Sequence, residues 1–241
     1  MARYDVLRAW FKTPNGAPCL FHLREGTNDF NTANSCLGDN DEYQLRGRRI
    51  EGLTLDIGGY LGSVAIPLLI DNPNATVICV EPIPENLDLI ARNAKVNGVS
   101  SRLTLIPGAV GKSGDPVSIA YRFEGGENEL HHAFVGNANT VQADAVPHQT
   151  VTYPALGIHD LIDDQEVAWA KVDAEGGEWG FLASGGLAQI ATIVGEFHPT
   201  VLPDGAMGSQ ARMRELLEPT HAVIVFTGPA EGPGGFTAVR R

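Results

Sequence analysis

The stretch LDIGGYLG, residues 55–62, decides how the rest of this sequence is interpreted. Apolar residues lead up to Asp56, glycines follow at positions 58 and 59, and apolar, helix-compatible residues come next. This order predicts a strand, a tight turn and the start of a helix. Because free N–H groups and the positive end of the helix dipole point out of such a turn, the stretch is typical of a site for an anion or a nucleotide.

Apolar runs that are typical of strands recur along the chain. They lie at residues 53–57, 76–81, 102–106, 167–173, 190–197 and 221–227. Helix-like stretches separate several of them, and this alternation predicts an α/β fold with a mostly parallel sheet and helices on both faces. The last run, HAVIVFT, is followed by GFTAVRR with no helix between them, which predicts a C-terminal antiparallel hairpin.

The stretch from Pro84 to Val99 predicts a helix. Apolar residues recur there at the i, i+3, i+4 and i+7 positions of one helical stripe, namely Leu87, Ile90, Ala91 and Ala94. Asn97-Gly98 is a typical C-terminal stop. We therefore expect an amphipathic helix that buries this stripe.

Two segments fall outside the regular alternation. Residues 1–50, rich in Asn and Asp, predict an N-terminal arm or cap ahead of a main domain at residues 51–241. Further along, two extra short strands at 117–123 and 150–153 flank a polar insert at about residues 124–149. An insert of this length is typical of a lid or a disordered loop. The arm could cap its own site or wrap around a second copy, so a homo-oligomer is left open.

The composition argues against several classes of function. With 17 Lys+Arg against 29 Asp+Glu, the formal net charge is −12, and such a surface repels nucleic acid. Three cysteines without CxxC spacing predict neither a zinc site nor a disulfide framework, and Cys79 is expected in the core. Since the chain has no apolar run of 18 residues and no stretch like a signal peptide, we expect a cytoplasmic protein without a membrane partner.

Spacing separates the ligands that the glycine turn could hold. A dinucleotide fingerprint, G-x-G-x-x-G, counted from Gly58 would need glycines where Tyr60 and Ser63 stand. The string GAVGKSG at 108–114 imitates a phosphate-binding P-loop, but its first two glycines are too close together to wrap a phosphate. NAD and ATP therefore fit poorly.

The remaining pattern is D-x-G-x-x-x-G, formed by Asp56, Gly58 and Gly62, with Glu81 at the end of the second main strand. This spacing resembles motifs I and II of the Rossmann-like S-adenosylmethionine (SAM) methyltransferases. Asp56 could hold the cationic amino-sulfonium group of SAM, and Glu81 is placed to accept both ribose hydroxyls. Gly108-Ala109 would border the adenine. The alternative is that Asp56 only caps the turn and the glycines only allow close packing.

Longer strings resemble one family more closely. HLREGTND at 22–29, DEY at 41–43, CVEPIPENLDLIARNAKVNG at 79–98, AWAKVDAEGGEWGFL at 168–182 and VGEFHP at 194–199 look like the FkbM-type methyltransferases. The resemblance covers about residues 20–200 and implies a Rossmann-like, seven-stranded fold. It implies a SAM-dependent O-methyltransferase that acts on a hydroxyl of a natural product, a sugar or another small metabolite. The residues expected to bind the cofactor are Asp56, Gly58, Gly59, Tyr60, Gly62, Glu81, Pro82, Asn86, Gly108 and Ala109.

This chain also departs from the family pattern. Tyr60 stands where Asn is common and could reshape the pocket near the methionine tail of the cofactor, and Gly177 stands where the family often has Ala. Arg24, Thr27 and Asp29 match a family signature in the arm. The sequence does not reveal the role of that signature, although closing over the cofactor is one option.

Methyl transfer to a hydroxyl requires an in-line geometry and a group that takes the proton. Asp173, at the end of the fourth main strand, is the first choice as this base or as a ligand of a divalent cation. The oxygen-rich group Asp173, Glu175 and Glu178 would suit Mg²⁺, although Glu178 could equally stabilise a helix N-terminus. Glu196 and His198 end the fifth main strand, and His198 is the second candidate base.

Other residues keep two interpretations each. Lys171 either holds Asp173 or Glu196 in the ionised form or extends to solvent. His131-His132 in the insert either reach a substrate or are simply exposed. The residues expected only to pack are Trp169, Trp179 and Phe181. For the whole protein, the alternatives to a hydroxylated small-molecule acceptor are an N or carboxylate acceptor, or a SAM-binding scaffold without catalysis.

Overall fold

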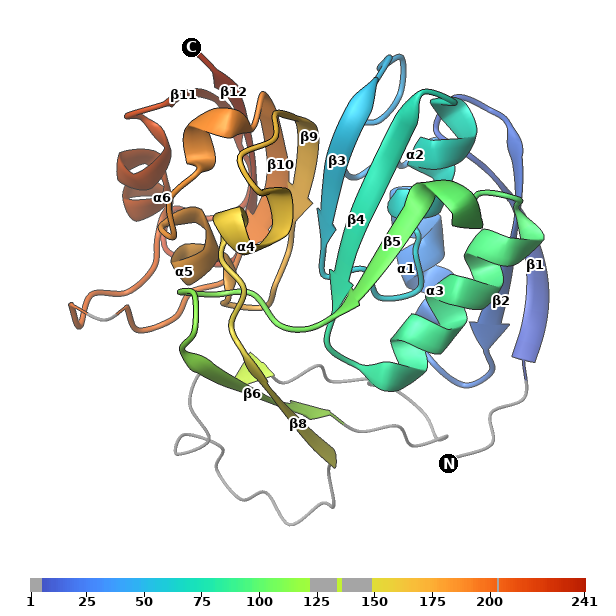
Figure 1. Cartoon of the computed structure of the whole chain (residues 1–241), viewed down its shortest axis with the longest axis horizontal. Helices are drawn as coiled ribbons and strands as arrows, with labels where there is room; N and C mark the ends of the chain where they lie inside the picture. The colour runs from blue at the N-terminus through green and yellow to red at the C-terminus, as the bar shows by residue number, and fades with distance from the viewer. Residues whose placement is uncertain (1–5, 122–133, 136–148, 203) are drawn as a thin grey trace.

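A computed structural model describes residues 6–121, 134–135, 149–202 and 204–241 of the chain. Its centre is a seven-stranded sheet in the order β11-β12-β10-β9-β3-β4-β5 (Figure 1). These strands are β3 (Gly52–Ile57), β4 (Ala75–Glu81), β5 (Leu103–Pro107), β9 (Val167–Val172), β10 (Thr192–Phe197), β11 (His221–Phe226) and β12 (Gly234–Arg240). Only β12 runs antiparallel to its neighbours, β10 and β11. The predicted mostly parallel sheet and its C-terminal hairpin are confirmed.

The strands begin and end within two residues of the predicted apolar runs. Their sequences are nearly continuous in apolar residues because both faces of a parallel sheet are covered. In β9, for example, five of the six residues are buried. The final strand β12 inserts between β10 and β11, so the C-terminal hairpin closes that side of the sheet.

Helices cover both faces of the sheet, as predicted (Figure 1). One face carries α1 (Asp29–Cys36), α2 (Ala65–Asp71) and α3 (Pro84–Val96), together with the hairpin of β1 (Val6–Lys12) and β2 (Pro18–Arg24). The other face carries α4 (Ile158–Ile162), α5 (Glu178–Leu182) and α6 (Gln210–Leu217). Short 3₁₀ turns are η1 (Ser100–Arg102) and η2 (Leu187–Gln189). Each face has its own hydrophobic core.

The side chains that were expected only to pack do so. Trp169 is buried in the core beneath α1–α3, and Trp179 and Phe181 are buried in the core beneath α4–α6. Cys79 is fully buried, and all three cysteines are free. None of the helices in the described part of the chain is long and apolar enough to span a membrane.

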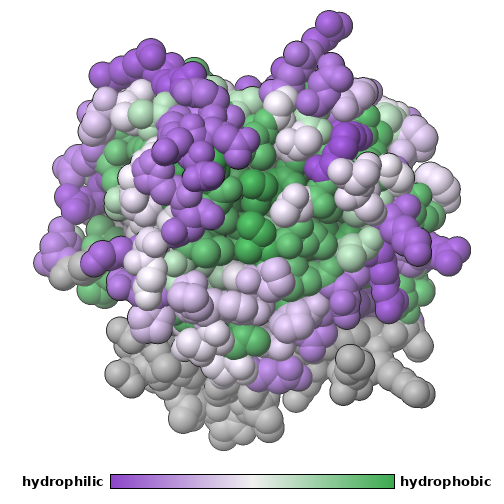
Figure 2. Space-filling model, in the orientation of Figure 1, coloured by the Kyte–Doolittle hydropathy of each residue, from purple (hydrophilic) through white to green (hydrophobic). Residues whose placement is uncertain are grey.

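The chain runs from β5 into β6 (Pro116–Tyr121) without a helix between them, whereas a helix follows β3 and another follows β4. The sheet is therefore covered less completely near β4 and β5, where Ile78 and Ile106 are only half-buried. Figure 2 shows apolar side chains gathered in the middle of this face, with hydrophilic residues around them.

The predicted extra strands are present as β6 and β8 (Gln149–Pro154). They pair antiparallel and, with β7 (Phe134–Val135), form a small sheet beyond the carboxyl ends of the parallel strands (Figure 1). The remainder of the predicted insert, including His131-His132, lies outside the described residues. The division into an arm at residues 1–50 and a domain at 51–241 stays a prediction.

Helix α3 forms where the sequence predicts it, but the predicted buried stripe was partly wrong. Ala91 is exposed and Leu87 only half-buried, whereas two asparagines, Asn86 and Asn93, are buried. Apolar periodicity could not identify this face because its polar members are satisfied by distant backbone and side-chain groups. The helix is thus rotated toward partners that lie far away in the sequence.

Asn93 joins α3 to the backbone of the arm. Its Oδ1 accepts a hydrogen bond from the His22 N–H (2.7 Å), and its Nδ2 donates to the carbonyl oxygens of His22 (3.2 Å) and Leu61 (3.1 Å). One turn later, Asn97 bonds both the N–H (2.9 Å) and the carbonyl (2.7 Å) of Leu20. The two amides satisfy backbone groups of β2, which fixes the arm against the main sheet.

We expect Asn93→Ala to lower the free energy of unfolding by roughly 2–4 kcal/mol, because each buried polar group left without a partner costs about 1–3 kcal/mol. Asn97→Ala is the matched control, and its effect should be smaller because Asn97 is only half-buried and water can replace its amide. Urea unfolding of both variants measures the difference. Equal losses would contradict this account of how the arm is attached.

Candidate active site

A cavity of about 780 Å³ lies at the carboxyl ends of the parallel strands. Its walls come from the arm, the glycine turn after β3, the start of α3, the segment after β5, and the ends of β9 and β10. Ligands of open α/β sheets bind at this edge, outside the carboxyl ends of the strands. The position therefore marks the cavity as the candidate active site.

The floor of the cavity is the turn predicted from LDIGGYLG. Gly58 has a φ of +80°, and a Cβ there would lie 1.9 Å from the carbonyl oxygen of Asp173. A Cβ at Gly59 would lie 2.2 Å from Cys79 Sγ. The N–H groups of both glycines donate to the carbonyl of Val80 (3.0 and 3.2 Å). Only glycine fits both positions, because the turn lies directly against β4 and the end of β9.

The carboxylate of Glu81 stands beside this turn, buried but lining the cavity. Its Oε2 accepts a hydrogen bond from the Tyr60 N–H (2.8 Å), and its Oε1 accepts from the Ile83 N–H (2.9 Å) and from Asn86 Nδ2 (3.0 Å). Burial raises the pKa of Glu81, and these hydrogen bonds oppose that rise. A carboxylate offers about four lone-pair sites, so about one is left, on Oε2.

Tyr60 lines the cavity and also contacts the arm. Its backbone is left-handed (φ +50°), which a residue other than glycine adopts only when its surroundings hold it. The N–H donates to Glu81, and the phenolic O–H donates to Asp29 Oδ1 in the arm (2.7 Å). The ring thus connects the turn to the arm while also lining the cavity.

Two of the predicted cofactor residues, Asp56 and Gly62, do not line the cavity. Asp56 is buried, and its Oδ2 accepts from the N–H of Ala65 at the start of α2 (3.1 Å). This contact matches the alternative that Asp56 caps the turn. Gly62 has a φ of +85°, and a Cβ there would lie 2.7 Å from Ile66 Cδ1, so this glycine lets α2 pack closely.

Lys171 is buried at the point where β3 and β9 end. Its ammonium donates to the carbonyls of Ile57 (3.0 Å) and Gly58 (2.5 Å) and lies 3.7 Å from Asp56 Oδ1 and 3.5 Å from Asp173 Oδ2. Burial alone would lower the pKa of Lys171, but the two carboxylates outweigh it and raise the pKa. Lys171 therefore stays charged, which favours the first of its two interpretations.

The segment after β5 closes the far side of the cavity. Gly108 and Ala109 line it there, as does Ile119 from β6. Pro82 also lines the cavity, and its carbonyl accepts a hydrogen bond from the phenolic O–H of Tyr153 in β8 (3.0 Å). The small β6–β8 sheet thus contributes to the wall that was expected to border an adenine.

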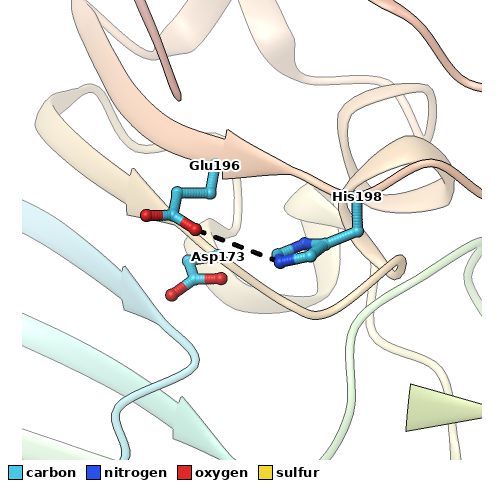
Figure 3. A group of neighbouring side chains, drawn as sticks. All are labelled: Asp173, Glu196 and His198. Carbon is cyan, nitrogen blue, oxygen red and sulfur yellow. Dashed lines mark ion pairs between the residues drawn. The ribbon is translucent and has the colours of Figure 1, made fainter. Parts of the chain in front are cut away.

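Three candidate catalytic residues come together at the ends of β9 and β10. Asp173, Glu196 and His198 each offer one ligating atom, and these atoms lie within 4.8 Å of one another (Figure 3). Glu196 and His198 point toward each other, with His198 Nε2 4.0 Å from Glu196 Oε2. Asp173 and Glu196 line the cavity, whereas His198 is not one of its lining residues.

His198 is surrounded by carboxylates. Its Nδ1 lies 3.3 Å from Glu178 Oε1 and its Nε2 lies 3.4 Å from Glu175 Oε2. Burial alone would lower the pKa of His198, but Glu178 and Glu175 outweigh it and raise the pKa to about 9. The ring is therefore an imidazolium at neutral pH. A protonated ring cannot accept a proton, so His198 is a poor candidate for the base.

The residues predicted to bind Mg²⁺ are not arranged as one ligand set. Both carboxylate oxygens of Glu178 accept backbone hydrogen bonds, one from the His198 N–H (2.5 Å) and one from the Gly176 N–H (2.7 Å). Among the described residues, the group close enough to share an ion is instead Asp173, Glu196 and His198. Because a charged imidazolium does not ligate a cation, this group fits Mg²⁺ poorly, and the Mg²⁺ prediction gains no support.

Sequence reasoning missed two arm residues at this site, Glu42 and Tyr43. The Tyr43 O–H donates to Asp173 Oδ2 (3.0 Å), and Glu42 lines the cavity near Glu196. Burial, Asp173 and Glu42 together raise the pKa of Glu196 to about 7. The signal was present in the DEY string of the arm, but nothing in it indicated contact with strands 130 residues later.

The charge on His198 makes the stability of the fold depend on pH. A folded-state pKa of about 9, above the ordinary 6.5, stabilises the protein below about pH 6.5, and this stabilisation is lost as the pH rises through 9. We expect the urea midpoint to fall over this range, and to fall less in His198→Gln. Urea unfolding from about pH 6 to pH 9.5 tests this, and parallel declines in both proteins would contradict it.

The family model of the methyltransferase FkbM domain matches residues 56–222. No curated protein matches the chain. Among solved structures, TrmN from Thermus thermophilus is 14% identical, with 92% of this chain and 55% of TrmN covered and a TM-score of 0.49. Precorrin-6y C5,15-methyltransferase from Geobacter metallireducens is 14% identical, with 91% and 92% covered and a TM-score of 0.42. TrmK from M. capricolum, in complex with S-adenosylhomocysteine, is 9% identical, with 83% and 66% covered and a TM-score of 0.45.

Proposed function

The chain belongs to the methyltransferase FkbM domain family, and from this premise we propose that it transfers a methyl group from SAM to a hydroxyl of a small, uncharged or cationic molecule. The observation that carries the choice of a hydroxyl is Glu196, a carboxylate with a pKa of about 7 that lines the cavity beside Asp173. A hydroxyl has to lose its proton as the new bond forms, and a base with a pKa near the working pH serves this best.

The described residues fit SAM on two counts. The glycine turn, Gly58 and Gly59, lines the cavity at the carboxyl ends of the strands, where ligands of open α/β sheets bind. Glu81 keeps about one acceptor site, on Oε2, which suits a ribose hydroxyl. When bound, SAM supplies an electrophilic methyl group on a sulfonium. The protein's part is to orient the acceptor and to take its proton.

Glu196 is placed to act as the base. Its side chain is 35% exposed, so it can face an acceptor in the cavity and later release a proton to water. The acceptor O–H would donate to the Glu196 carboxylate. The proton would remain on Glu196 as the methyl group passes from the sulfonium sulfur to the acceptor oxygen and S-adenosylhomocysteine is left. Asp173, held by Lys171 and the Tyr43 O–H, is then a positioning and electrostatic group rather than the first choice of base.

The charge of the cavity restricts the chemical class of the acceptor. The acidic side chains that line it are Glu42, Glu81, Asp173, Glu175 and Glu196, against one basic lining side chain among the described residues, Lys171. A carboxylate or phosphate acceptor would meet repulsion from these groups, and the net charge of −12 also argues against nucleic acid. An N acceptor remains the alternative, and a scaffold without catalysis is the other. A cytoplasmic location and a homo-oligomer stay expectations from the sequence.

The cofactor assignment is tested by calorimetric titration with S-adenosylhomocysteine, SAM and NADH. We expect the adenosyl ligands to bind and NADH not to bind. Glu81→Ala should weaken binding about 10- to 100-fold, because a hydrogen bond to a charged group is worth about 1.5–3 kcal/mol. Asp88→Ala, on the exposed side of α3, is the control. Binding of NADH instead would refute the assignment.

The base is tested after a screen of neutral hydroxylated compounds has found an acceptor. We expect Glu196→Gln to lower kcat about 10²- to 10⁴-fold, the usual contribution of a general base. In the wild type, kcat/KM should rise with pH up to about 7 and then level off, because the carboxylate form is the active one. Asp173→Asn should keep a rise of kcat/KM with pH but move it to lower pH, because the charge of Asp173 helps to raise the pKa of Glu196. A wild-type profile without a step near pH 7, or full activity in Glu196→Gln, would favour an N acceptor.

A further inference from the structure

A closed network of buried hydrogen bonds links the arm to the glycine turn. Arg24 Nη2 and Nε donate to the two oxygens of Asp29 (2.8 and 3.0 Å), and Arg24 Nη1 donates to Asn86 Oδ1 (2.8 Å). Asn86 Nδ2 donates to Glu81 Oε1 (3.0 Å), and the Tyr60 N–H donates to Glu81 Oε2 (2.8 Å). The Tyr60 O–H donates to Asp29 Oδ1 (2.7 Å) and completes the ring.

Arg24 decides which way the Asn86 amide faces. An amide can be turned so that either its oxygen or its NH₂ group points at Glu81. Because the Arg24 guanidinium can only donate, Asn86 must present its oxygen to Arg24 and its NH₂ to Glu81. This leaves Glu81 Oε1 with two donors, and Oε2 as the oxygen that is free to accept a ligand hydroxyl.

Asp29 acts on the other oxygen of the same carboxylate. It holds the phenolic O–H of Tyr60, and Arg24 also stacks over the Tyr60 ring at 5.4 Å from its centroid. These contacts hold Tyr60 in its left-handed conformation, which aims its N–H at Glu81 Oε2. Both oxygens of Glu81 are thereby oriented by one ion pair in the arm.

The burial of this ion pair is hard to explain by stability alone. The side chains of Arg24 and Asp29 are 3% and 0% exposed. Burying two charges costs as much as their attraction returns, and well-packed apolar residues often stabilise a fold equally well. The forked guanidinium, in contrast, provides fixed directions toward both Asp29 and Asn86 at once, which an apolar pair could not do.

We propose that Arg24 and Asp29 are positioning residues that orient the free lone pair of Glu81 toward the ribose hydroxyls of the cofactor. The proposal rests on the proposed function, since it concerns the same adenosyl ligand. It assigns a role to the arm signature that the sequence left open. If Arg24 and Asp29 act in this way, docking of the arm and binding of the ribose depend on each other.

The test compares S-adenosylhomocysteine with analogues that lack the 2′- or the 3′-hydroxyl, by calorimetry and without any turnover. In the wild type, the loss of the hydroxyl that Glu81 accepts should weaken binding about 10- to 100-fold. The ratio to be compared is the dissociation constant of this analogue divided by that of S-adenosylhomocysteine. In Arg24→Met, this ratio should fall to within about threefold of one, because Glu81 is no longer oriented. Arg24→Lys should resemble Arg24→Met, since an ammonium cannot reach both partners in fixed directions.

Two further variants make the result specific. Arg46→Met removes an exposed arm ion pair with Asp39 and should keep the wild-type ratio. Asn86→Leu breaks the link to Glu81 while leaving the Arg24–Asp29 pair intact, so it should lower the ratio even if Arg24→Met does not fold. Thermal unfolding confirms that each variant is folded.

Each outcome separates the two proposals. Absence of S-adenosylhomocysteine binding in the wild type would overturn the proposed function. Wild-type binding with a ratio near one would show that Glu81 does not recognise the ribose and would overturn the positioning role alone. The same follows if folded Arg24→Met and Asn86→Leu lose affinity equally for all three ligands, because an unchanged ratio indicates a merely structural role.

Discussion

The site depends on the hydrogen bonds and ion pairs that the buried ammonium of Lys171 makes. It donates to the carbonyls of Ile57 and Gly58 and faces Asp56 on one side and Asp173 on the other. A buried charge is tolerated only when it is paired, and here the pairing joins the ends of β3 and β9. The glycine turn and the acidic end of the cavity therefore keep a fixed relation to each other.

The arm is a second constraint, and it reaches both halves of the cavity. Arg24 and Asp29 contact the side where Glu81 lies, while Glu42 and Tyr43 contact the side of Asp173 and Glu196. Asn93 in α3 and Asn97 just after it hold the backbone of β2 in place. A segment that resembles an appendage in the sequence thus supplies side chains to both ends of the cavity.

Local sequence patterns were sufficient to predict most of the fold. Apolar runs located the strands of the main sheet to within two residues, because strands covered on both faces need continuous apolar sequence. The failure at α3 has the opposite cause. Asn86 and Asn93 are buried because their partners, Glu81 and His22 among them, are brought there by other elements, and periodicity carries no information about such partners.

For the charged residues of the site, too, the sequence predicted their positions but not their interactions. The sequence located Asp173, Glu196 and His198 at strand ends, and they do come together. It could not foresee that Glu178 and Glu175 would keep His198 protonated, or that Glu42 would help to raise the pKa of Glu196 to about 7. Both pKa shifts come from electrostatic interactions between groups on different elements. These interactions weaken with distance, and spacing along the chain does not give that distance.

By itself, then, the sequence determined the strand–turn–helix at LDIGGYLG, the order of strands and helices, and the family. These depend on residue type, on periodicity and on short-range backbone geometry, all of which are local. Only the tertiary structure decided that Asp56 caps α2 and pairs with Lys171, that Tyr60 contacts the arm, and that the pKa of Glu196 is raised to about 7. Each of these depends on burial and on partners distant in the chain, and those exist only once the elements have packed.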